Sequence, residues 1–98
     1  MDIRHELNGV TFVWHDEKAR LNVVKHDGIT FEQAAAVFFD PFLRLVDAGR
    51  NDEARDAVIG YDVTGRLLFV VHVVFENETI RLISARKATP QERRDHDS

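Results

Sequence analysis

The fold is decided by residues 66–86, RLLFVVHVVFENETIRLISAR, which predict two strands joined by a tight turn. The run from residue 67 to residue 75 is apolar at almost every position, as expected of a central strand that is covered on much of both faces. Asn77 and Glu78 supply the turn between the two strands. The sequence therefore predicts a β-hairpin at the centre of a sheet.

The register of this hairpin predicts which side chains share a face of the sheet. A turn centred on residues 77 and 78 pairs Val74 with Arg81 and His72 with Ile83. His72 and Arg81 then become diagonal neighbours, and Arg66 lies at the far end of the same row. The opposite face is almost purely apolar and is expected to take the helices. A basic cluster on the less covered face could hold a phosphate group.

Two helices are predicted before these strands. The first covers residues 15–28, where acidic residues begin the segment and Lys25 and His26 end it, in agreement with the helix dipole. Leu21 and Val24 are expected to point towards the core. A polar stripe at helical spacing is formed by Lys18, Asn22 and Lys25. The second helix covers residues 30–39.

Strong local signals mark the ends of the second helix. Thr30 is followed three residues later by Gln33, the spacing of a capping box, and Asp40 and Pro41 stop the helix. Its predicted apolar face consists of Phe31, Ala34, Ala35 and Phe38.

The remaining segments complete one α+β domain over residues 1–98. Further strands are predicted at residues 10–14, 42–46 and 55–63, with a polar loop at residues 47–53. A short helix is expected to start near Thr89, with Pro90 at its first position. The predicted architecture is two N-terminal helices packed on an antiparallel sheet, followed by a short C-terminal helix.

Composition limits the classes of function. The net charge of −4 argues against coating of nucleic acid through overall charge, although it leaves room for a small basic cleft. No cysteine is present, and the five histidines lack ligand spacing, so neither a disulfide framework nor a metal site is expected. No apolar run approaches a membrane span, and the first residues lack the order of a secretory signal. We therefore expect a cytoplasmic protein.

Two long segments carry a resemblance to a known family. Residues 12–41, FVWHDEKARLNVVKHDGITFEQAAAVFFDP, and residues 65–94, GRLLFVVHVVFENETIRLISARKATPQERR, together resemble the BrnT family of toxins from bacterial type II toxin–antitoxin modules. The resemblance covers nearly the whole chain, and its specificity lies in the order and spacing of individually weak elements. The matching elements are Trp14, Lys18, Asn22, Lys25, His26, Phe31, Phe38 to Pro41, Gly65, Arg66, the RLISARKAT box, Glu92 and Arg93.

This resemblance implies a RelE-like fold and an endoribonuclease that cuts RNA without a metal or other cofactor. It also implies a BrnA-type antitoxin that neutralises the toxin and carries a ribbon–helix–helix DNA-binding part. DNA would then be contacted only through the antitoxin, in a complex that represses its own operon. His15, His72 and His96 depart from the residues common at these family positions, so the proton-transfer assignment stays open.

The candidate phosphate ligands are arginines and one lysine. RNA cleavage by the 2′-hydroxyl places negative charge on phosphorus, and a guanidinium group binds phosphate bidentately while staying charged. Arg66 and Arg81 are predicted to stabilise the transition state, with Arg86 as an additional phosphate contact. Lys25 could supply charge to the RNA or move a proton.

The candidate acid or base is a histidine, because its intrinsic pKa lies near neutrality. His72 and His26 are both candidates. His26 could instead only complement the end of its helix. Trp14 could stack on a base or could belong to the core.

Two further classes of function remain open from the sequence. One is a catalytically weak binding module that acts as co-repressor with a DNA-binding antitoxin. The other is a structural α+β domain unconnected with RNA, which would lack a basic concave surface joining Arg66, His72 and Arg81.

Overall fold

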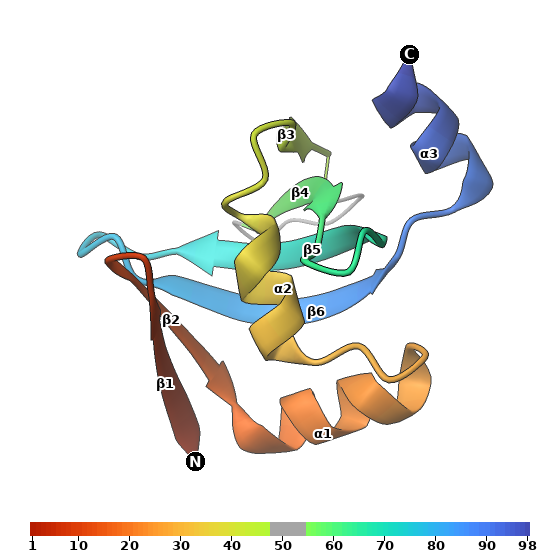
Figure 1. The fold of residues 1–98 in the computed structure, drawn as a ribbon. Coiled ribbons are helices and arrows are strands. Elements are labelled where there is room, and N and C mark those ends of the chain that lie inside the picture. The colour runs from red at the N-terminus through yellow and green to blue at the C-terminus, as the bar shows by residue number, and fades with distance from the viewer. Residues whose placement is uncertain (48–54) are drawn as a thin grey trace.

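The computed structural model describes residues 1–47 and 55–98, which form a six-stranded sheet and three helices (Figure 1). The strands are β1 (Asp2–Leu7), β2 (Val10–His15), β3 (Arg44–Val46), β4 (Asp56–Tyr61), β5 (Leu67–Val74) and β6 (Ile80–Lys87). The helices are α1 (Asp16–Lys25), α2 (Phe31–Val37) and α3 (Pro90–Asp97). None of the helices within these described ranges is long and apolar enough to span a membrane.

The sheet is mixed, with the order β1-β2-β6-β5-β4-β3. β2 and β6 run parallel, pairing Phe12 with Ile80 and Val13 with Arg81, while the other neighbouring strands are antiparallel. The prediction of a purely antiparallel sheet was therefore wrong at this one pair. The α+β class is confirmed, whereas the relation to the RelE-like fold stays a prediction.

The sequence reading missed β1. Asn8 and Gly9 join β1 to β2 with positive φ angles of 51° and 82°, the conformation that a tight hairpin turn requires. The strand itself was missed because its residues are mostly charged and exposed, as befits a strand at the edge of a sheet.

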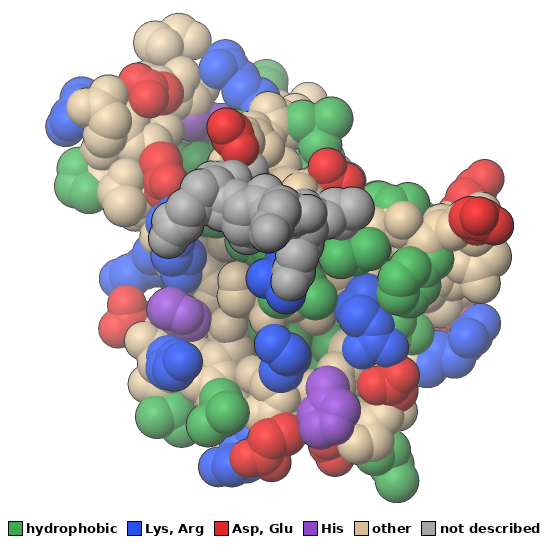
Figure 2. Space-filling view, turned by 180° about the vertical axis from the view of Figure 1, so that it is seen from behind, with side chains coloured by type: hydrophobic (Ala, Val, Ile, Leu, Met, Phe, Trp, Pro, Cys, Tyr) green, Lys and Arg blue, Asp and Glu red, His purple; other side chains and the backbone are tan. Residues whose placement is uncertain are grey.

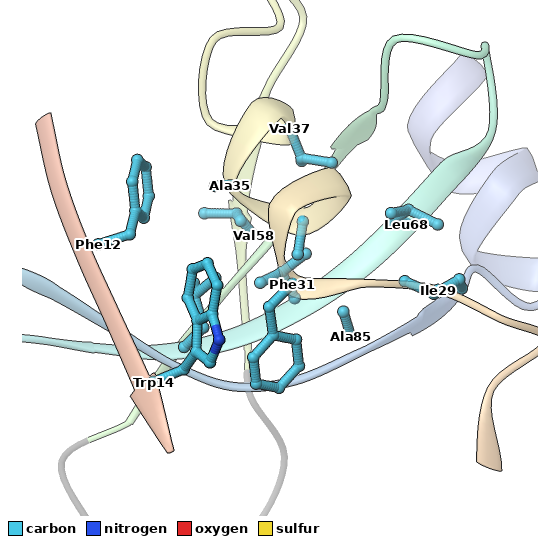
Figure 3. Packing of buried hydrophobic residues seen from close by; sticks show 12 residues of the cluster. Phe12, Trp14, Ile29, Phe31, Ala35, Val37, Val58, Leu68 and Ala85 are labelled. Carbon is cyan, nitrogen blue, oxygen red and sulfur yellow. The ribbon is translucent and has the colours of Figure 1, made fainter. Parts of the chain in front are cut away.

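The hydrophobic core lies between α2 and the sheet, where α2 crosses the face of β5 and β6 (Figure 1). The capping box of Thr30 and Gln33 is present, as predicted. Trp14 and Phe31 meet edge to face with ring centroids 5.7 Å apart, and they lie side by side in Figure 3. The buried cluster consists of Phe12, Trp14, Ile29, Phe31, Ala34, Ala35, Val37, Val58, Leu68, Val70, Leu82 and Ala85.

Next to its turn, the hairpin of β5 and β6 differs by one residue from the predicted register. His72 pairs with Leu82 and Val73 with Arg81, because the turn is closed by a hydrogen bond from the amide of Phe75 to the carbonyl of Thr79. Since side chains alternate along a strand, this slip places Arg81 on the face opposite to that of His72, which lies under α2. Beyond the bulge the predicted register holds, since Val71 pairs with Ser84 and Val70 with Ala85. The face of β5 that was expected to be less covered is nevertheless the one under α2, because Leu68 and Val70 belong to the core.

α1 also shows a different face to the core than predicted. Asn22 is only 5% exposed, whereas Leu21 and Val24 are 42% and 74% exposed. The side chain of Asn22 donates to the carbonyl of Ala85 at 2.8 Å and accepts from its amide at 3.1 Å. Beyond Arg81, where the pairing with β2 ends, Asn22 thus takes the place of a neighbouring strand on β6.

The other predicted elements are present with small shifts of their ends. The strand expected at residues 42–46 is shorter and forms β3, and the one expected at 55–63 forms β4. α3 begins at Pro90, with Thr89 as its N-cap. The polar loop expected at residues 47–53 lies almost wholly outside the described residues.

Candidate functional site

A basic hollow lies between α1 and β6. Its volume is about 290 Å³, and its lining residues are Lys18, Leu21, Asn22, Lys25, His26, Arg55, Ile83 and Ser84. Figure 2 views the molecule from the side opposite to that of Figure 1 and shows Lys and Arg side chains gathered across the middle of this surface. We refer to this feature below as the basic hollow.

Two local features of the chain build the basic hollow. The bonds between Asn22 and Ala85 fix α1 against β6, which brings the Lys18 and Lys25 side of the helix to the strand. On β6 a β-bulge leaves Ile83 without a partner on β5, because His72 pairs with Leu82 and Val71 pairs with Ser84. β-Bulges re-aim side chains and are common beside functional sites.

The charge of the basic hollow is positive and open to solvent. Within residues 1–47 and 55–98, neither Lys18 nor Lys25 forms an ion pair, and both are exposed. His26 is half-buried and caps the C-terminus of α1, where its backbone amide donates to the carbonyl of Asn22 at 2.9 Å. The hollow can therefore attract an anion and offers an imidazole beside it.

Arg81 lies on the outward face of β6, two residues before Ile83. Its side chain forms an ion pair with Asp2 of β1. Its guanidinium group donates to the Asp2 carboxylate at 2.6 Å and lies 5.9 Å from the centroid of the Phe75 ring. The hydrogen bond from Arg81 lowers the pKa of Asp2. Because both side chains are partly exposed, an anionic ligand can compete with Asp2 for Arg81.

Arg86 joins β6 to α3. Its guanidinium group makes two hydrogen bonds to the Glu92 carboxylate, at 2.8 and 2.9 Å, and lies 4.2 Å from the centroid of the Phe69 ring. The hydrogen bond from Arg86 is the main reason that the pKa of Glu92 is lowered. This bidentate pair fixes the start of α3 on the sheet.

Arg66 lies at the other end of the hairpin. Its Nε donates to Asp62 at 3.2 Å. Burial raises the pKa of Asp62, but hydrogen bonds from Thr64 and Arg66 outweigh this effect and lower it. Arg81 pairs with Val73, so Arg66 and Arg81 are separated by almost the length of β5, about 23 Å at the usual rise per residue.

His72 is buried under α2 and is only 3% exposed. Its ring meets Phe38 edge to face with centroids 4.9 Å apart. Burial lowers the pKa of His72, and the nearby Asp56 carboxylate offsets this only in part. The predicted convergence of Arg66, His72 and Arg81 was therefore wrong: the hairpin register separates His72 from Arg81, and the length of β5 separates Arg66 from both.

Trp14 belongs to the core, as one of the two interpretations of the sequence expected. It is 2% exposed and packs between β2 and α2, so the structure leaves no open ring face for a nucleobase.

The structure brings Lys25 and His26 together with residues that the sequence did not single out as a site. Arg55 and Ser84 line the same hollow, and so does Lys18, which had been interpreted as part of a polar stripe and of the family resemblance but not as a site residue. The position of Ser84 at the hollow depends on the bulge, for which no sequence signal is evident. No group of three or more His, Asp or Glu side chains in the described parts of the chain is placed to hold a metal ion.

Comparisons with known proteins identify the family. The family model described as "Ribonuclease toxin, BrnT, of type II toxin-antitoxin system" matches residues 14–92. The fold is similar to the crystal structure of the Brucella abortus ribonuclease toxin BrnT, with a TM-score of 0.61 and 20% sequence identity, over 78% of this chain and 92% of that chain. No curated protein matches this chain. The chain belongs to the BrnT family of ribonuclease toxins of type II toxin–antitoxin systems.

Proposed function

We propose that this protein is a metal-independent endoribonuclease that cuts RNA at the basic hollow. The observation that carries the proposal is the meeting of Lys18, Lys25 and His26 beside β6, where the two ammonium groups form no ion pair within the described residues. Such a site attracts a phosphate group and holds a proton-transfer group next to it.

The reaction proposed is attack of the ribose 2′-hydroxyl on the adjacent phosphorus. The bond from the 2′-oxygen to phosphorus forms while the bond from phosphorus to the 5′-oxygen breaks. His26 accepts the 2′-hydroxyl proton. Lys25 stabilises the negative charge that develops on the phosphate oxygens and donates a proton to the leaving 5′-oxygen. The products are a 2′,3′-cyclic phosphate and a free 5′-hydroxyl group.

Arg81 and Arg86 are proposed as further phosphate contacts on either side of the basic hollow. Both extend from the outward face of β6, on which Ser84 lies between them. Each would exchange a carboxylate partner, Asp2 or Glu92, for an RNA phosphate. The roles expected for Arg66 and His72 remain predictions that no observation tests, and neither residue lines this hollow.

The partner proposed is a BrnA-type antitoxin, through which the complex would contact DNA. Membership of a type II toxin–antitoxin family implies an antitoxin partner. Exposed apolar side chains are available for docking such a partner, since Phe42, Leu45 and Val63 are 70%, 77% and 84% exposed.

The test is expression of the chain with and without its antitoxin, followed by mapping of RNA ends. We expect growth arrest only without the antitoxin, and a 2′,3′-cyclic phosphate on the upstream RNA fragments. His26→Ala and Lys25→Ala should each reduce the cleavage rate at least about 100-fold, the usual scale for an acid–base group. Arg20→Ala is the matched control, since Arg20 lies on α1 but outside the hollow and pairs with Glu17.

A second candidate function is a co-repressor with little catalytic activity. The observation that favours it is that Arg66, Arg81 and Arg86 are each held by a carboxylate of the same chain. The same experiment separates the two functions: intact RNA and normal growth, together with unchanged antitoxin binding, would support the co-repressor.

A further inference from the structure

A second hollow lies beside α3, at the other end of the same outward face of the sheet. Its volume is about 250 Å³, which is slightly below the range of about 300–1,000 Å³ typical of pockets for drug-sized ligands. It therefore suits a single planar ring system rather than a whole nucleotide. Its lining residues are Arg44, Val46, Asp47, Ile59, Phe69, Glu92, Asp95 and His96.

His96 gives this hollow an unsatisfied polar group. It is the buried residue of α3, at 8% exposure, and its ring meets Tyr61 with centroids 5.7 Å apart. Its Nδ1 atom is buried and has no hydrogen-bond partner among the residues that the structure describes. A buried polar atom without a partner is unfavourable. A turn of the His96 ring would bring this nitrogen to the hollow, where a ligand can supply the missing hydrogen bond.

The second hollow is close enough to the basic hollow to share one RNA strand. Ser84 lines the basic hollow, and Phe69, which lines the second hollow, pairs with Arg86 on β6. Ser84 and Arg86 are two residues apart on one strand, a separation of about 7 Å along the strand axis. The Arg86 guanidinium group over the Phe69 ring is the kind of surface on which RNA bases stack.

The chemistry of the lining selects a base rather than a phosphate. Val46, Ile59 and Phe69 give apolar walls, which suit the faces of an aromatic ring. Carboxylates at the rim repel phosphate but accept hydrogen bonds from N–H groups, and a carboxylate oxygen accepts more than one such bond. Asp95 uses one oxygen for Gln91. Both oxygens of Glu92 accept from Arg86, and one also accepts from the amide of Thr89, so Asp95 keeps most of the free acceptor capacity.

We propose that the second hollow binds one nucleobase of the RNA, and that its acceptors favour guanine, whose edge carries adjacent N–H donors. This inference rests on the proposed RNA substrate and adds a source of sequence preference to it. His96 supplies a hydrogen bond to the base, and Arg86 lies between the two hollows to contact the connecting backbone.

The test uses the full chain and short RNAs with 2′-O-methyl groups, which block attack by the 2′-oxygen. The RNAs differ at one position that carries guanine, inosine or adenine, and binding is followed by fluorescence anisotropy. We expect about tenfold tighter binding of the guanine RNA than of the adenine RNA, the loss expected when a two-point base contact is missing. Inosine, which lacks the 2-amino group, should lie between them.

Two variants test the second hollow itself. His96→Phe keeps a ring against Tyr61 but removes the nitrogens, and Val46→Trp fills the hollow from β3. Both should abolish the guanine preference while changing the affinity for an all-uridine RNA by less than about twofold. His5→Phe is the matched control on β1, and it should keep the preference.

The outcomes separate this inference from the ribonuclease proposal. Two results overturn this inference alone. One is that both variants retain the guanine preference. The other is that the wild-type chain cuts unmodified RNA but shows no preference for guanine. Guanine preference in a wild-type chain that leaves unmodified RNA intact overturns the ribonuclease and supports the base site. A chain that binds none of these RNAs overturns both.

Discussion

At the scale of single residues, Asn22 contributes more to the fold than its place in a polar stripe indicates. Its amide group satisfies both backbone groups of Ala85 and also donates to the carbonyl of Ile29 at 3.1 Å. We expect Asn22→Ala to lower the free energy of unfolding by about 3 kcal/mol, because it leaves buried backbone groups without partners. Urea denaturation followed by circular dichroism measures this loss.

Asn77→Ala is the control for this substitution. Asn77 is exposed in the β5–β6 turn, where its side chain accepts from the amide of Thr79 at 3.1 Å. Its replacement should cost less than about 1 kcal/mol, since solvent can replace an exposed hydrogen bond. Equal losses for the two variants would contradict the role assigned to Asn22.

His72 makes stability depend on pH. Burial holds its pKa below the usual value of 6.5, so the unfolded chain binds a proton more readily than the native protein. The stability contributed by neutral His72 is fully present above pH 6.5 and is lost as the pH falls below that value. The charged group identified near it is Asp56, which weakens the effect without reversing it.

Denaturation in urea at pH 7.5 and pH 5.5 tests this dependence. The wild-type protein should be less stable at the lower pH, and His72→Phe, which keeps a ring against Phe38, should remove most of the difference. A variant that keeps the full difference would show that another group is responsible.

Single residues were predictable from the sequence only where no long-range register was involved. Lys25 and His26 come from one short segment and do share a hollow. The partners of His72 depend on where the β5–β6 turn closes, and a shift of one residue puts Arg81 on the opposite face. The bulge that leaves Ile83 without a partner on β5 is likewise a property of the paired strands and not of either strand alone.

At the scale of elements, the chain contains the same capping box twice, at the start of α2 and at the start of α3. α2 buries four of its residues against the sheet, whereas α3 buries only His96. Thr30→Ala should therefore lower the global free energy of unfolding by about 1 kcal/mol. Urea denaturation measures this change.

Thr89→Ala makes the matching change at α3, with a different expected result. Because α3 is terminal and mostly exposed, it should open locally without unfolding the sheet. We expect faster amide hydrogen exchange in residues 90–97 and an unchanged global free energy of unfolding. Loss of global stability from this variant would mean that α3 folds as one unit with the core.

The elements themselves were largely predictable, because caps, turns and apolar runs are local signals. The capping box at Thr30 and the proline at the start of α3 were identified correctly. β1 was missed although Asn8 and Gly9 form a strong turn signal, since its exposed residues lack the apolar alternation of a half-buried strand.

At the scale of the whole molecule, a net charge of −4 coexists with a positive surface around the basic hollow. If three to five cations contact phosphates, the logarithm of RNA affinity should fall with the logarithm of salt concentration with a slope of about −2 to −3.5. Lys18→Ala and Lys25→Ala should each flatten this slope by about 0.7. Fluorescence anisotropy of uncleavable RNA over a salt series measures it.

The control for the salt series is again Arg20→Ala, which removes one cation from α1 outside the hollow. An equally flattened slope for this variant would mean that the RNA responds to total charge and not to this surface.

The overall arrangement could not be read from local patterns. The parallel pairing of β2 with β6 joins residues near the two ends of the chain, and local periodicity carries no information about such a pair. The family resemblance, in contrast, is confirmed by the match over residues 14–92, because it depends on ordered residues across the whole domain.

The parallel pair also bears on how the chain emerges from the ribosome. β2 is made early, but its central neighbour β6 follows after most of the chain, and Ile83 and Ser84 of the basic hollow lie on that same late strand. A nascent chain that stops before residue 80 can assemble neither the closed core nor the hollow. A polypeptide released before residue 80 therefore lacks β6, and with it one wall of the hollow at which RNA cleavage is proposed.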